Sequence, residues 1–284
     1  MIVQGTTKVF AILGDPVSHS LSPQLHNAAL TAVGINGIYV PFHVVPEQLA
    51  TAVAGVRALQ IAGLSVTVPH KERIIPLLDE IDPAAQRIGA VNTVVNREGR
   101  LIGYNTDAPG FLQALRDTLD FSPLHKEVLL IGAGGAARAA LIALAQAGAT
   151  TVVVANRTPD RAVDLIASCC TEFPACQMMA TSLDALHTGD FLGRADLLVN
   201  TSALGLAGES FPSAIIAGLK PSALIFDMVY SRTTASTPLV RQGESAGHRA
   251  ADGRSMLIAQ GEAAFSLWTG LVPPGGVMKA ALNF

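Results

Sequence analysis

Charged residues are scarce in this sequence. Of its 284 residues only 14% are charged, whereas 50% are hydrophobic, and the formal net charge is -3. Because no run of basic residues occurs, we expect neither nucleic acid nor anionic membranes as partners. The large apolar fraction is enough for a sizeable core and argues against disorder. At this length we expect about two domains.

Cysteine is also rare. The three cysteines are Cys169, Cys170 and Cys176. An odd number in a long chain argues against a disulfide framework and favours a reducing compartment. Their spacing matches no zinc motif, and no pair of histidines at helical spacing accompanies them, so we expect no bound metal.

Long uninterrupted apolar runs are missing as well. The most apolar region, residues 139–155, contains Gln146 and Gly148 and changes its period midway. This favours a helix followed by a strand over a membrane span. The apolar run near the N-terminus is short and is broken by Gly14 and Asp15, unlike a signal peptide. We therefore expect a cytoplasmic protein without a membrane partner.

Strand and helix patterns alternate along the chain. Strands are expected at residues 8–14, 38–44, 64–68, 127–132, 151–156, 196–201 and 223–229, and helices at 48–59, 108–120, 256–268 and in the alanine-rich stretch up to Gly148. A further helix is expected at Ser22-Pro23, with the serine as its N-cap. Segments 90–96 and 100–105 flank turn residues, which predicts a hairpin and hence one antiparallel element. The fold class is therefore α/β with a parallel, doubly wound sheet.

A glycine-rich segment, GAGGAAR (132–138), joins strand 127–132 to a helix. Gly132, Gly134 and Ala137 fit G-x-G-x-x-A, in which the first glycine permits a tight turn and the second lets the backbone approach a pyrophosphate. The small third residue allows helix and strand to pack closely, and the helix N-terminus offers free N–H groups to phosphates. A glycine-rich helix start without a ligand is the alternative, but the strand–helix context favours a nucleotide site.

The residues after the next strand bear on the choice of cofactor. An NAD enzyme is expected to carry Asp or Glu there for the ribose 2′-OH. This chain has Asn156-Arg157-Thr158 and then Arg161. Arginine suits the extra negative charge of a 2′-phosphate, which favours NADP over NAD. The alternative is an ordinary surface turn with a solvated arginine.

One lysine follows a buried strand. In the segment LSVTVPHKE (64–72), Lys71 comes just past the expected strand end. The first turn of a helix favours acids, so a lysine there indicates a function. Asp107 precedes Ala108-Pro109 and could equally be a helix N-cap. His70, beside Lys71, is interpreted as a packing or tuning residue.

Eight motifs occur in the order and spacing of one family. They are GDPVSHSLSP (14–23), VTVPHK (66–71), GAVNT (89–93), GYNTD (103–107), GAGGAAR (132–138), NRT (156–158), DMVY (227–230) and DGRSMLIAQ (252–260). With them the chain resembles the shikimate dehydrogenases, which interconvert 3-dehydroshikimate and shikimate with NADP(H) in the chorismate pathway of aromatic amino acid biosynthesis. The resemblance runs nearly from end to end of the chain.

The resemblance implies a two-domain oxidoreductase. Residues 1–107 and 251–284 would form a discontinuous α/β substrate-binding domain with a mainly parallel sheet, and residues 108–250 a Rossmann-type NADP domain. Lys71 would be the catalytic acid and base, paired with Asp107. The substrate would contact Ser18, Ser20, Ser65, Thr67, Asn92, Tyr230 and Gln260. The cofactor would contact Gly132, Ala133, Gly134, Gly135, Ala136, Asn156, Arg157, Thr158, Arg161, Thr201, Met228, Gly253 and Met256.

These residue types suit the chemistry. The substrate is a small anionic ring whose hydroxyls need side chains that both donate and accept hydrogen bonds. Hydride transfer to a ketone builds charge on oxygen, so a proton donor must lie within hydrogen-bond reach, and a lysine ammonium can serve. Alcohol oxidation requires the neutral lysine or a proton relay. Burial lowers the pKa of a lysine, whereas a nearby aspartate raises it.

The chain departs from the family pattern near the expected substrate site. Ser65 stands where asparagine is usual, Ala108 where glycine is usual, and Arg254-Ser255 replace a smaller, more apolar pair. Three functions therefore stay open: a shikimate dehydrogenase, a paralogue that acts on quinate or an amino-substituted analogue with NAD or NADP, and a nucleotide-sensing binding module without turnover. A monomer and a homodimer are both compatible with the sequence.

Overall fold

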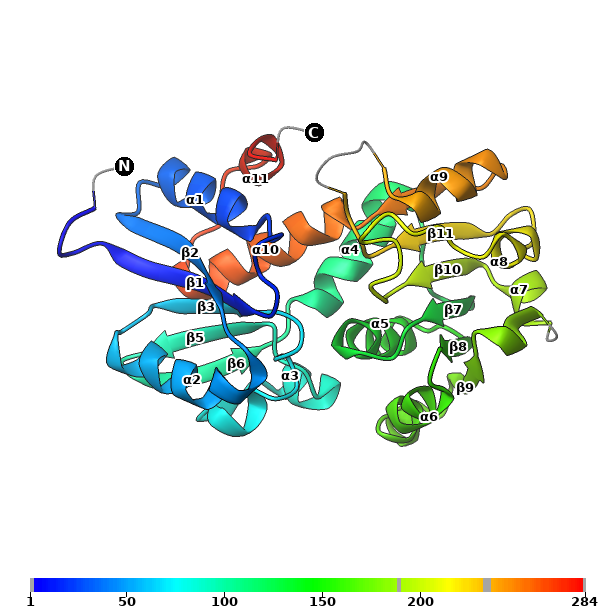
Figure 1. The fold of residues 1–284 in the computed structure, drawn as a ribbon, viewed down its shortest axis with the longest axis horizontal. Helices are drawn as coiled ribbons and strands as arrows, with labels where there is room; N and C mark the ends of the chain where they lie inside the picture. Colours follow the sequence, from blue (N-terminus) through cyan, green and yellow to red (C-terminus); the bar gives the residue numbers. More distant parts are fainter. Residues whose placement is uncertain (1–2, 188–189, 232–235, 283–284) are drawn as a thin grey trace. The chain divides into compact units, whose positions relative to one another are not determined.

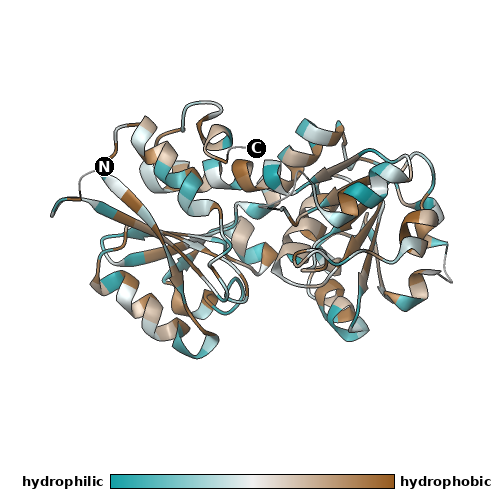
Figure 2. Cartoon of the chain, turned by 45° about the horizontal axis from the view of Figure 1, so that its top comes forward, coloured by the Kyte–Doolittle hydropathy of each residue, from teal (hydrophilic) through white to brown (hydrophobic). Residues whose placement is uncertain are grey.

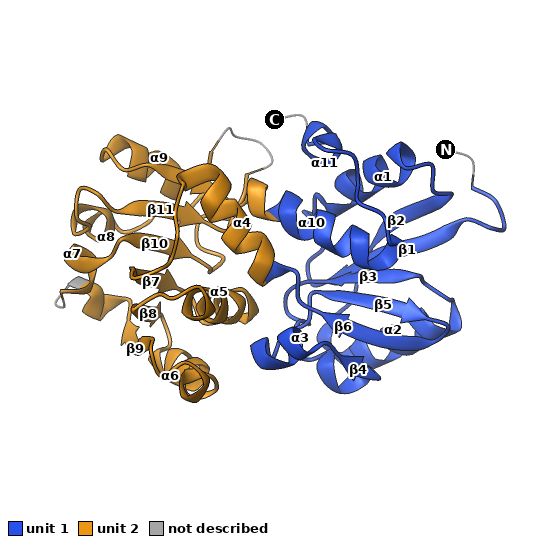
Figure 3. Ribbon diagram, turned by 180° about the vertical axis from the view of Figure 1, so that it is seen from behind, with its two compact units in different colours: residues 1–107, 257–284 blue, residues 108–256 orange. Residues whose placement is uncertain are grey.

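The computed structural model describes residues 3–187, 190–231 and 236–282. The chain folds into two compact units (Figure 3). Unit 1 consists of Met1–Asp107 and Leu257–Phe284, and unit 2 of Ala108–Met256. Each unit is built on one β-sheet with helices packed against it (Figure 1). No helix in the described part of the chain is long and apolar enough to cross a membrane.

Unit 1 contains a mixed six-stranded sheet. Its strands are β1 (Lys8–Gly14), β2 (Gly37–His43), β3 (Gly63–Val66), β4 (Glu80–Ile81), β5 (Thr93–Arg97) and β6 (Arg100–Tyr104). The order across the sheet is β2-β1-β3-β5-β6-β4, and β5 alone runs antiparallel to its neighbours. The predicted mainly parallel sheet with one antiparallel element is confirmed.

Local sequence explains the hairpin of unit 1. Strands β5 and β6 are joined by Glu98 and Gly99, which both adopt positive φ angles, 54° and 91°. Two such residues form a tight turn whose twist matches that of the flanking strands. The turn expected at residues 97–99 is therefore present.

Strand β3 ends at Val66, two residues before the expected end, and Val68 is already 64% exposed.

Helices cover the sheet of unit 1. They are α1 (Ser22–Ala32), α2 (Leu49–Ala58), α3 (Pro83–Ile88), α11 (Val277–Ala280), the part of α10 (Arg254–Thr269) that begins at Leu257, and the short 3-10 turns η1 (Pro46–Gln48) and η2 (Ile75–Leu77). The prediction that Ser22 is the N-cap of α1 is wrong, because the helix begins at Ser22 and its N-cap is Leu21. The hydroxyl of Ser20 instead accepts a hydrogen bond from the Ser22 N–H at 3.2 Å.

The C-terminal helix α10 is anchored to strands from the first hundred residues. Trp268 Nε1 donates a hydrogen bond to the Val94 carbonyl at 3.0 Å. A Cβ atom on Gly63 would collide with the Trp268 ring, so the ring packs directly on the backbone of β3. His26 of α1 stacks on Tyr39 with ring centroids 4.5 Å apart, and its ring lies 5.0 Å from that of Trp268. Unit 1 is therefore built from two distant parts of the sequence.

Unit 2 contains a six-stranded parallel sheet. Its strands are β7 (Glu127–Ile131), β8 (Thr151–Asn156), β9 (Gln177–Ser182), β10 (Leu197–Asn200), β11 (Leu224–Asp227) and β12 (Ala250–Asp252). The order is β12-β11-β10-β7-β8-β9, which is the doubly wound order of dinucleotide-binding domains. The predicted Rossmann-type fold is confirmed. Strands β9 and β12 were not predicted, because β9 is half-exposed and polar and β12 has only three residues.

Apolar side chains from strands and helices fill the core of unit 2. Its helices are α4 (Asp107–Leu119, from Ala108 onward), α5 (Gly135–Gln146), α6 (Pro159–Ala167), α7 (Phe191–Arg194), α8 (Ser213–Ala217), α9 (Pro238–Ser245) and the first residues of α10, with the 3-10 turns η3 (Cys170–Glu172) and η4 (Asp184–His187). Figure 2 shows apolar residues, in brown, along the strands of both sheets. Strands buried on both faces are expected to be continuous apolar runs, as β7 and β8 are.

Candidate active site

Lys71 and Asp107 form a buried ion pair in unit 1. Lys71 Nζ lies 2.6 Å from Asp107 Oδ2, and the two side chains are only 15% and 7% exposed. Lys71 stands in the turn after β3, whereas Asp107 follows β6 and begins α4. Two residues 36 positions apart in sequence thus meet at the same end of the sheet. A shielded pair of this kind is suited to holding a proton donor in one place.

The carboxylate of Asp107 is fully engaged. Its Oδ2 accepts from Lys71, and its Oδ1 accepts from Asn92 Nδ2 at 2.8 Å. The Asp107 N–H donates to Asn105 Oδ1 at 3.0 Å. Since α4 begins at Asp107 itself, this residue is not the N-cap that the sequence allowed as an alternative. Its carboxylate serves Lys71 and Asn92.

Asn92 is the centre of a buried polar network. Its Oδ1 accepts from the Thr106 N–H at 2.8 Å and from Thr93 Oγ1 at 2.9 Å, and its Nδ2 also donates to Thr106 Oγ1 at 2.9 Å. Asn105 Nδ2 donates to the Ala90 carbonyl at 2.9 Å. Sequence reasoning missed the supporting residues Thr93, Asn105 and Thr106, although all three stand inside the GAVNT and GYNTD motifs. In this structure Asn92 orients Asp107.

The other polar residues expected at the substrate lie around the same end of the unit 1 sheet. Ser65 is buried on β3, and Thr67 is half-buried just beyond it, with its N–H bonded to the Leu13 carbonyl at 2.9 Å. A Cβ on Gly14 would collide with the Thr67 methyl group, so any larger residue at the end of β1 would displace the Thr67 side chain. The loop after Gly14 carries Ser18, which is exposed, and Ser20, which is half-buried.

Two expected substrate residues lie apart from these strands in sequence. Gln260 belongs to α10 and is half-buried in unit 1, where its Nε2 donates to the Leu257 carbonyl of its own helix at 2.7 Å. Tyr230 is half-buried in unit 2, three residues after β11. The structure therefore assigns Gln260 to the same unit as Lys71 and Tyr230 to the other unit.

The glycine loop in unit 2 has the shape of a phosphate cradle. Gly132 has a φ of 113°, and a Cβ there would come within 2.6 Å of Thr201 Oγ1. Gly134 is the N-cap of α5, no side chain caps the helix, and a Cβ on Gly134 would meet open space. Ala137 is fully buried against the sheet. The loop also includes Ala133, Gly135 and Ala136, which are half-buried. A pyrophosphate could approach this backbone and accept from its N–H groups.

Arginines follow the next strand of the unit 2 sheet. Asn156 ends β8, and its Nδ2 donates to the Thr158 carbonyl at 2.8 Å, which closes the turn. Arg157 and Arg161 are exposed, and neither forms an ion pair with any described residue. Two guanidinium groups without a carboxylate partner fit a 2′-phosphate.

A buried carboxylate organises the ends of β10 and β11. Asp227 is fully buried, and burial raises its pKa to about 6. It accepts hydrogen bonds from Asn200 Nδ2 at 2.8 Å, Thr237 Oγ1 at 2.6 Å and the Val229 N–H at 3.1 Å. These bonds hold the segment that begins with Met228. Sequence reasoning missed this role of Asp227, although the residue opens the DMVY motif.

The remaining residues expected at the cofactor lie near this segment. The Met228 N–H donates to the Asn200 carbonyl at 2.9 Å. A Cβ on Gly253 would collide with the Met228 carbonyl, which explains the glycine. Met256 is 8% exposed in the first turn of α10. Thr201 Oγ1 donates to the Ile131 carbonyl at 2.8 Å and thereby ties the end of β10 to the end of β7.

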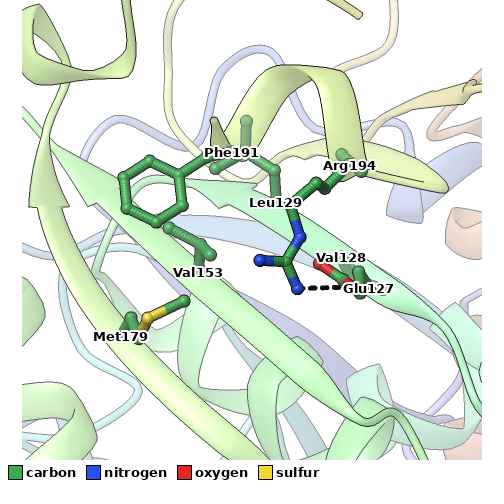
Figure 4. A pocket seen from close by; sticks show the side chains of 8 residues that line it. Glu127, Val128, Leu129, Val153, Met179, Phe191 and Arg194 are labelled. Carbon is green, nitrogen blue, oxygen red and sulfur yellow. Dashed lines mark hydrogen bonds and ion pairs between the residues drawn. The ribbon is translucent and has the colours of Figure 1, made fainter. Parts of the chain in front are cut away.

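A separate pocket in unit 2 lies near the end of the sheet at which β7 begins, opposite to the glycine loop. Figure 4 shows the side chains that line it. It is lined by Glu127, Val128, Leu129, Val153, Met179, Phe191, Arg194 and Ala195. Glu127 begins β7, whereas the glycine loop follows the end of that strand. The charged groups of the pocket, Glu127 and Arg194, pair with each other at 2.8 Å. This pocket is therefore distinct from the glycine loop and its neighbours.

Three family models match the chain. They are the shikimate dehydrogenase substrate binding domain over residues 12–94, shikimate / quinate 5-dehydrogenase over 117–203 and the shikimate 5'-dehydrogenase C-terminal domain over 253–282. Together they span both units.

Individual relatives match over almost the whole chain. A shikimate dehydrogenase (NADP(+)) of Citrifermentans bemidjiense is 49% identical and covers 99% of this chain and 97% of its own. The crystal structure of shikimate dehydrogenase from Aquifex aeolicus superposes with a TM-score of 0.88 at 35% identity and covers 100% of both chains. That of shikimate 5-dehydrogenase from Thermus thermophilus, in complex with NADP(H) and shikimate, has a TM-score of 0.83 at 38% identity and covers 98% of this chain and 99% of that one.

Proposed function

The chain belongs to the shikimate dehydrogenase family, and on that premise we propose that it catalyses the reversible, NADP-dependent reduction of 3-dehydroshikimate to shikimate. The observation that carries the proposal is the largely buried Lys71–Asp107 pair, with Nζ 2.6 Å from Oδ2 and side chains 15% and 7% exposed. A ketone reductase needs such a shielded donor, and a nucleotide-binding module without turnover does not. The reaction is a step of aromatic amino acid biosynthesis.

We assign the cyclic hydroxy acid to unit 1 and NADP to unit 2. Unit 1 carries Lys71, Asp107 and most of the neutral hydroxyl and amide side chains expected at the substrate. Unit 2 carries the glycine loop and the two arginines, Arg157 and Arg161, that pair with no carboxylate among the described residues. The pyrophosphate would rest on the N–H groups that begin with Gly134, and the 2′-phosphate on Arg157 and Arg161. Bound NADPH would supply the hydride.

Lys71 is the proton donor for ketone reduction. An ammonium group has three N–H donors, and within the described chain the hydrogen bond of Lys71 Nζ goes to Asp107. The other donors can reach the substrate oxygen as negative charge develops on it. In the reverse direction the same nitrogen, once deprotonated, accepts the hydroxyl proton. Asp107 keeps Nζ in one place throughout and balances its charge.

Neutral polar residues supply specificity. Ser18, Ser20, Ser65, Thr67, Tyr230 and Gln260 can each both donate and accept a hydrogen bond, which matches a ring with several hydroxyls. Asn92 uses both N–H groups of its amide on Thr106 and Asp107, so its part in the site is to hold Asp107. A site that bonds each hydroxyl rejects an analogue that lacks one, because a buried polar group is then left unpaired. The three thiols are free in this structure, in keeping with a cytoplasmic enzyme.

A spectrophotometric comparison tests the proposal. Purified protein is assayed with shikimate and with quinate, each with NADP and with NAD, by following the absorbance of the reduced nicotinamide. We expect the highest kcat/KM with shikimate and NADP. A preference for quinate or NAD would instead support the paralogue, and tight NADP binding without turnover on either acid would support the binding module.

A further inference from the structure

His70 is a fully buried imidazole that the proposed reaction does not use. It stands directly before Lys71, and its Nε2 lies 2.6 Å from the carbonyl oxygen of Val44. Because a carbonyl only accepts, Nε2 carries the proton, and Nδ1 is left as an acceptor. Among the described residues Nδ1 has no hydrogen-bond partner. Burying Nδ1 without a partner lowers the stability of the fold. The hydrogen bond of Nε2 is therefore the feature that an imidazole contributes at this position.

The acceptor of this bond belongs to the segment beside the serine loop. Val44 directly follows β2, and its N–H donates to the Gly14 carbonyl at 3.1 Å. Gly14 ends β1, and the loop with Ser18 and Ser20 begins there. The Asp15 N–H in turn donates to the Val68 carbonyl at 2.9 Å. One residue, Val44, thus links the His70 side chain to the start of the loop expected to hold the substrate carboxylate.

The backbone around Lys71 is held from the other side by the segment that leads into β5. The Lys71 carbonyl accepts from the Val91 N–H at 2.8 Å, next to Asn92. Within the turn, the His70 N–H donates to the Thr67 carbonyl and the Ile74 N–H to the His70 carbonyl, both at 2.9 Å. The turn is therefore fixed on one side by Val91, and on the other by the imidazole bond to Val44 together with the backbone bonds of Thr67 to Leu13 and of Asp15 to Val68. Those backbone bonds end at Val68, so the imidazole bond is the contact on that side that lies next to Lys71. Loss of that bond would let Lys71 Nζ shift relative to Asp107.

A second buried histidine of unit 1, His26, differs from His70 in its contacts. His26 is 1% exposed, also has an unpartnered Nδ1 in the described structure, and packs against the rings of Tyr39 and Trp268. Burial lowers its pKa to about 3. His26 touches rings, whereas His70 bonds to a main-chain carbonyl beside the site. A phenyl ring in place of His26 would keep its ring contacts. A phenyl ring in place of His70 would remove the hydrogen bond to Val44.

We propose that His70 is a positioning residue, which holds Lys71 against Asp107 through its hydrogen bond to Val44. The proposal rests on the proposed function. A donor misplaced by about 1 Å can cost about 100-fold in rate, so a change confined to this bond has a measurable effect. It should lower kcat and leave the KM for NADP unchanged, because His70 and the glycine loop belong to different units.

Three variants of the full chain test this role. His70→Phe fills the space without a donor, His70→Gln keeps a donor that can reach the Val44 carbonyl, and His26→Phe is the matched control for a buried histidine. We expect His70→Phe to lower kcat by about 10- to 100-fold, with the KM for NADP within about twofold of the wild type. His70→Gln should restore most of kcat, and His26→Phe should keep it. Wild-type kcat in His70→Phe, or equal losses in His70→Phe and His70→Gln, would overturn the proposal.

A second readout does not depend on turnover. Peptide mass spectrometry measures how fast an amine-reactive reagent modifies Lys71 in the wild type and the three variants. A buried, ion-paired lysine reacts slowly, so modification should be several-fold faster in His70→Phe but not in His26→Phe. Unchanged modification in His70→Phe would contradict the role of His70. If the wild type turned over neither acid, the proposed function would fail, and this labelling would still decide whether His70 positions Lys71.

Discussion

Asn92 Nδ2 donates to Asp107 Oδ1 at 2.8 Å, on the opposite oxygen from the one that faces Lys71. Asn92 directly precedes β5 and Asp107 follows β6, so the hairpin of these strands brings the two residues together. An amide carries no titratable group. Its orientation is fixed because its oxygen is bonded to Thr93 and Thr106. The Lys71–Asp107 pair is thus held by a neutral group in a fixed orientation.

Removal of the proton donor should abolish most of the activity. We expect Lys71→Ala to lower kcat by about 100- to 10,000-fold, since general acid catalysis contributes about that much. Binding of shikimate, measured by calorimetry, should persist because the hydroxyl and amide side chains remain. Lys279→Ala, an exposed lysine in the same unit, is the control and should keep full activity. Full turnover in Lys71→Ala would refute the assigned role.

Removal of the Asn92 amide should destabilise unit 1. Asn92→Ala leaves the Thr106 N–H and one oxygen of Asp107 without a buried partner, which should lower the free energy of unfolding by about 1–3 kcal/mol. Denaturant titration measures this change, and kcat should fall as well. The control is Asn36→Ala, an exposed asparagine, which we expect to change stability by less than about 0.5 kcal/mol. Equal effects of the two substitutions would contradict the network.

The two arginines after β8 should set the preference for NADP. Replacing both Arg157 and Arg161 by alanine removes the charge-assisted hydrogen bonds expected for a 2′-phosphate, so the KM for NADP should rise about 10- to 100-fold. The KM for NAD should hardly change, since NAD lacks that phosphate. Arg194→Ala, at the far pocket, is the control and should alter neither constant. Similar losses with both cofactors would show that these arginines do not recognise the 2′-phosphate.

The buried Asp227 should give stability a specific dependence on pH. Burial raises its pKa from 3.8 to about 6, so between these values the folded protein binds more protons than the unfolded chain. Protonation of Asp227 therefore contributes most to the free energy of unfolding below pH 3.8, and this contribution is lost as the pH rises through 6. Over that window the loss amounts to about 3 kcal/mol.

The variant Asp227→Asn isolates this contribution because its side chain does not titrate. Whatever its stability at acid pH, it should gain about 3 kcal/mol relative to the wild type between about pH 4 and pH 7. Urea unfolding at a series of pH values measures the difference. A constant difference between the two proteins across this range would mean that Asp227 does not titrate in it.

Much of the fold could be predicted because its signals are local. The apolar runs of β1, β7 and β8 and the glycine loop before α5 each lie within one short stretch of sequence, and the structure confirms them. Strand β9 could not be found in this way, since its pattern is half-exposed and its pairing with β8 stabilises it. The N-cap of α1 was misplaced by one residue because serine is a preferred N-cap, whereas the structure has Leu21 there without a side-chain cap and Ser22 as the first helical residue.

The candidate site divides in the same way. Residue types and motif order were enough to predict the reaction class, which the relatives confirm. The interpretation of the arginines and the roles of Lys71 and Asp107 rest on the same signals and stay predictions. Only the tertiary structure decided which polar atoms meet: that Asn92 supports Asp107, that Asp227 organises two strand ends, and that His70 reaches Val44. Periodicity and turn chemistry act over a few residues and can be recognised along the chain. Hydrogen bonds between buried groups depend on strand register and packing between distant segments, which no single stretch of sequence encodes.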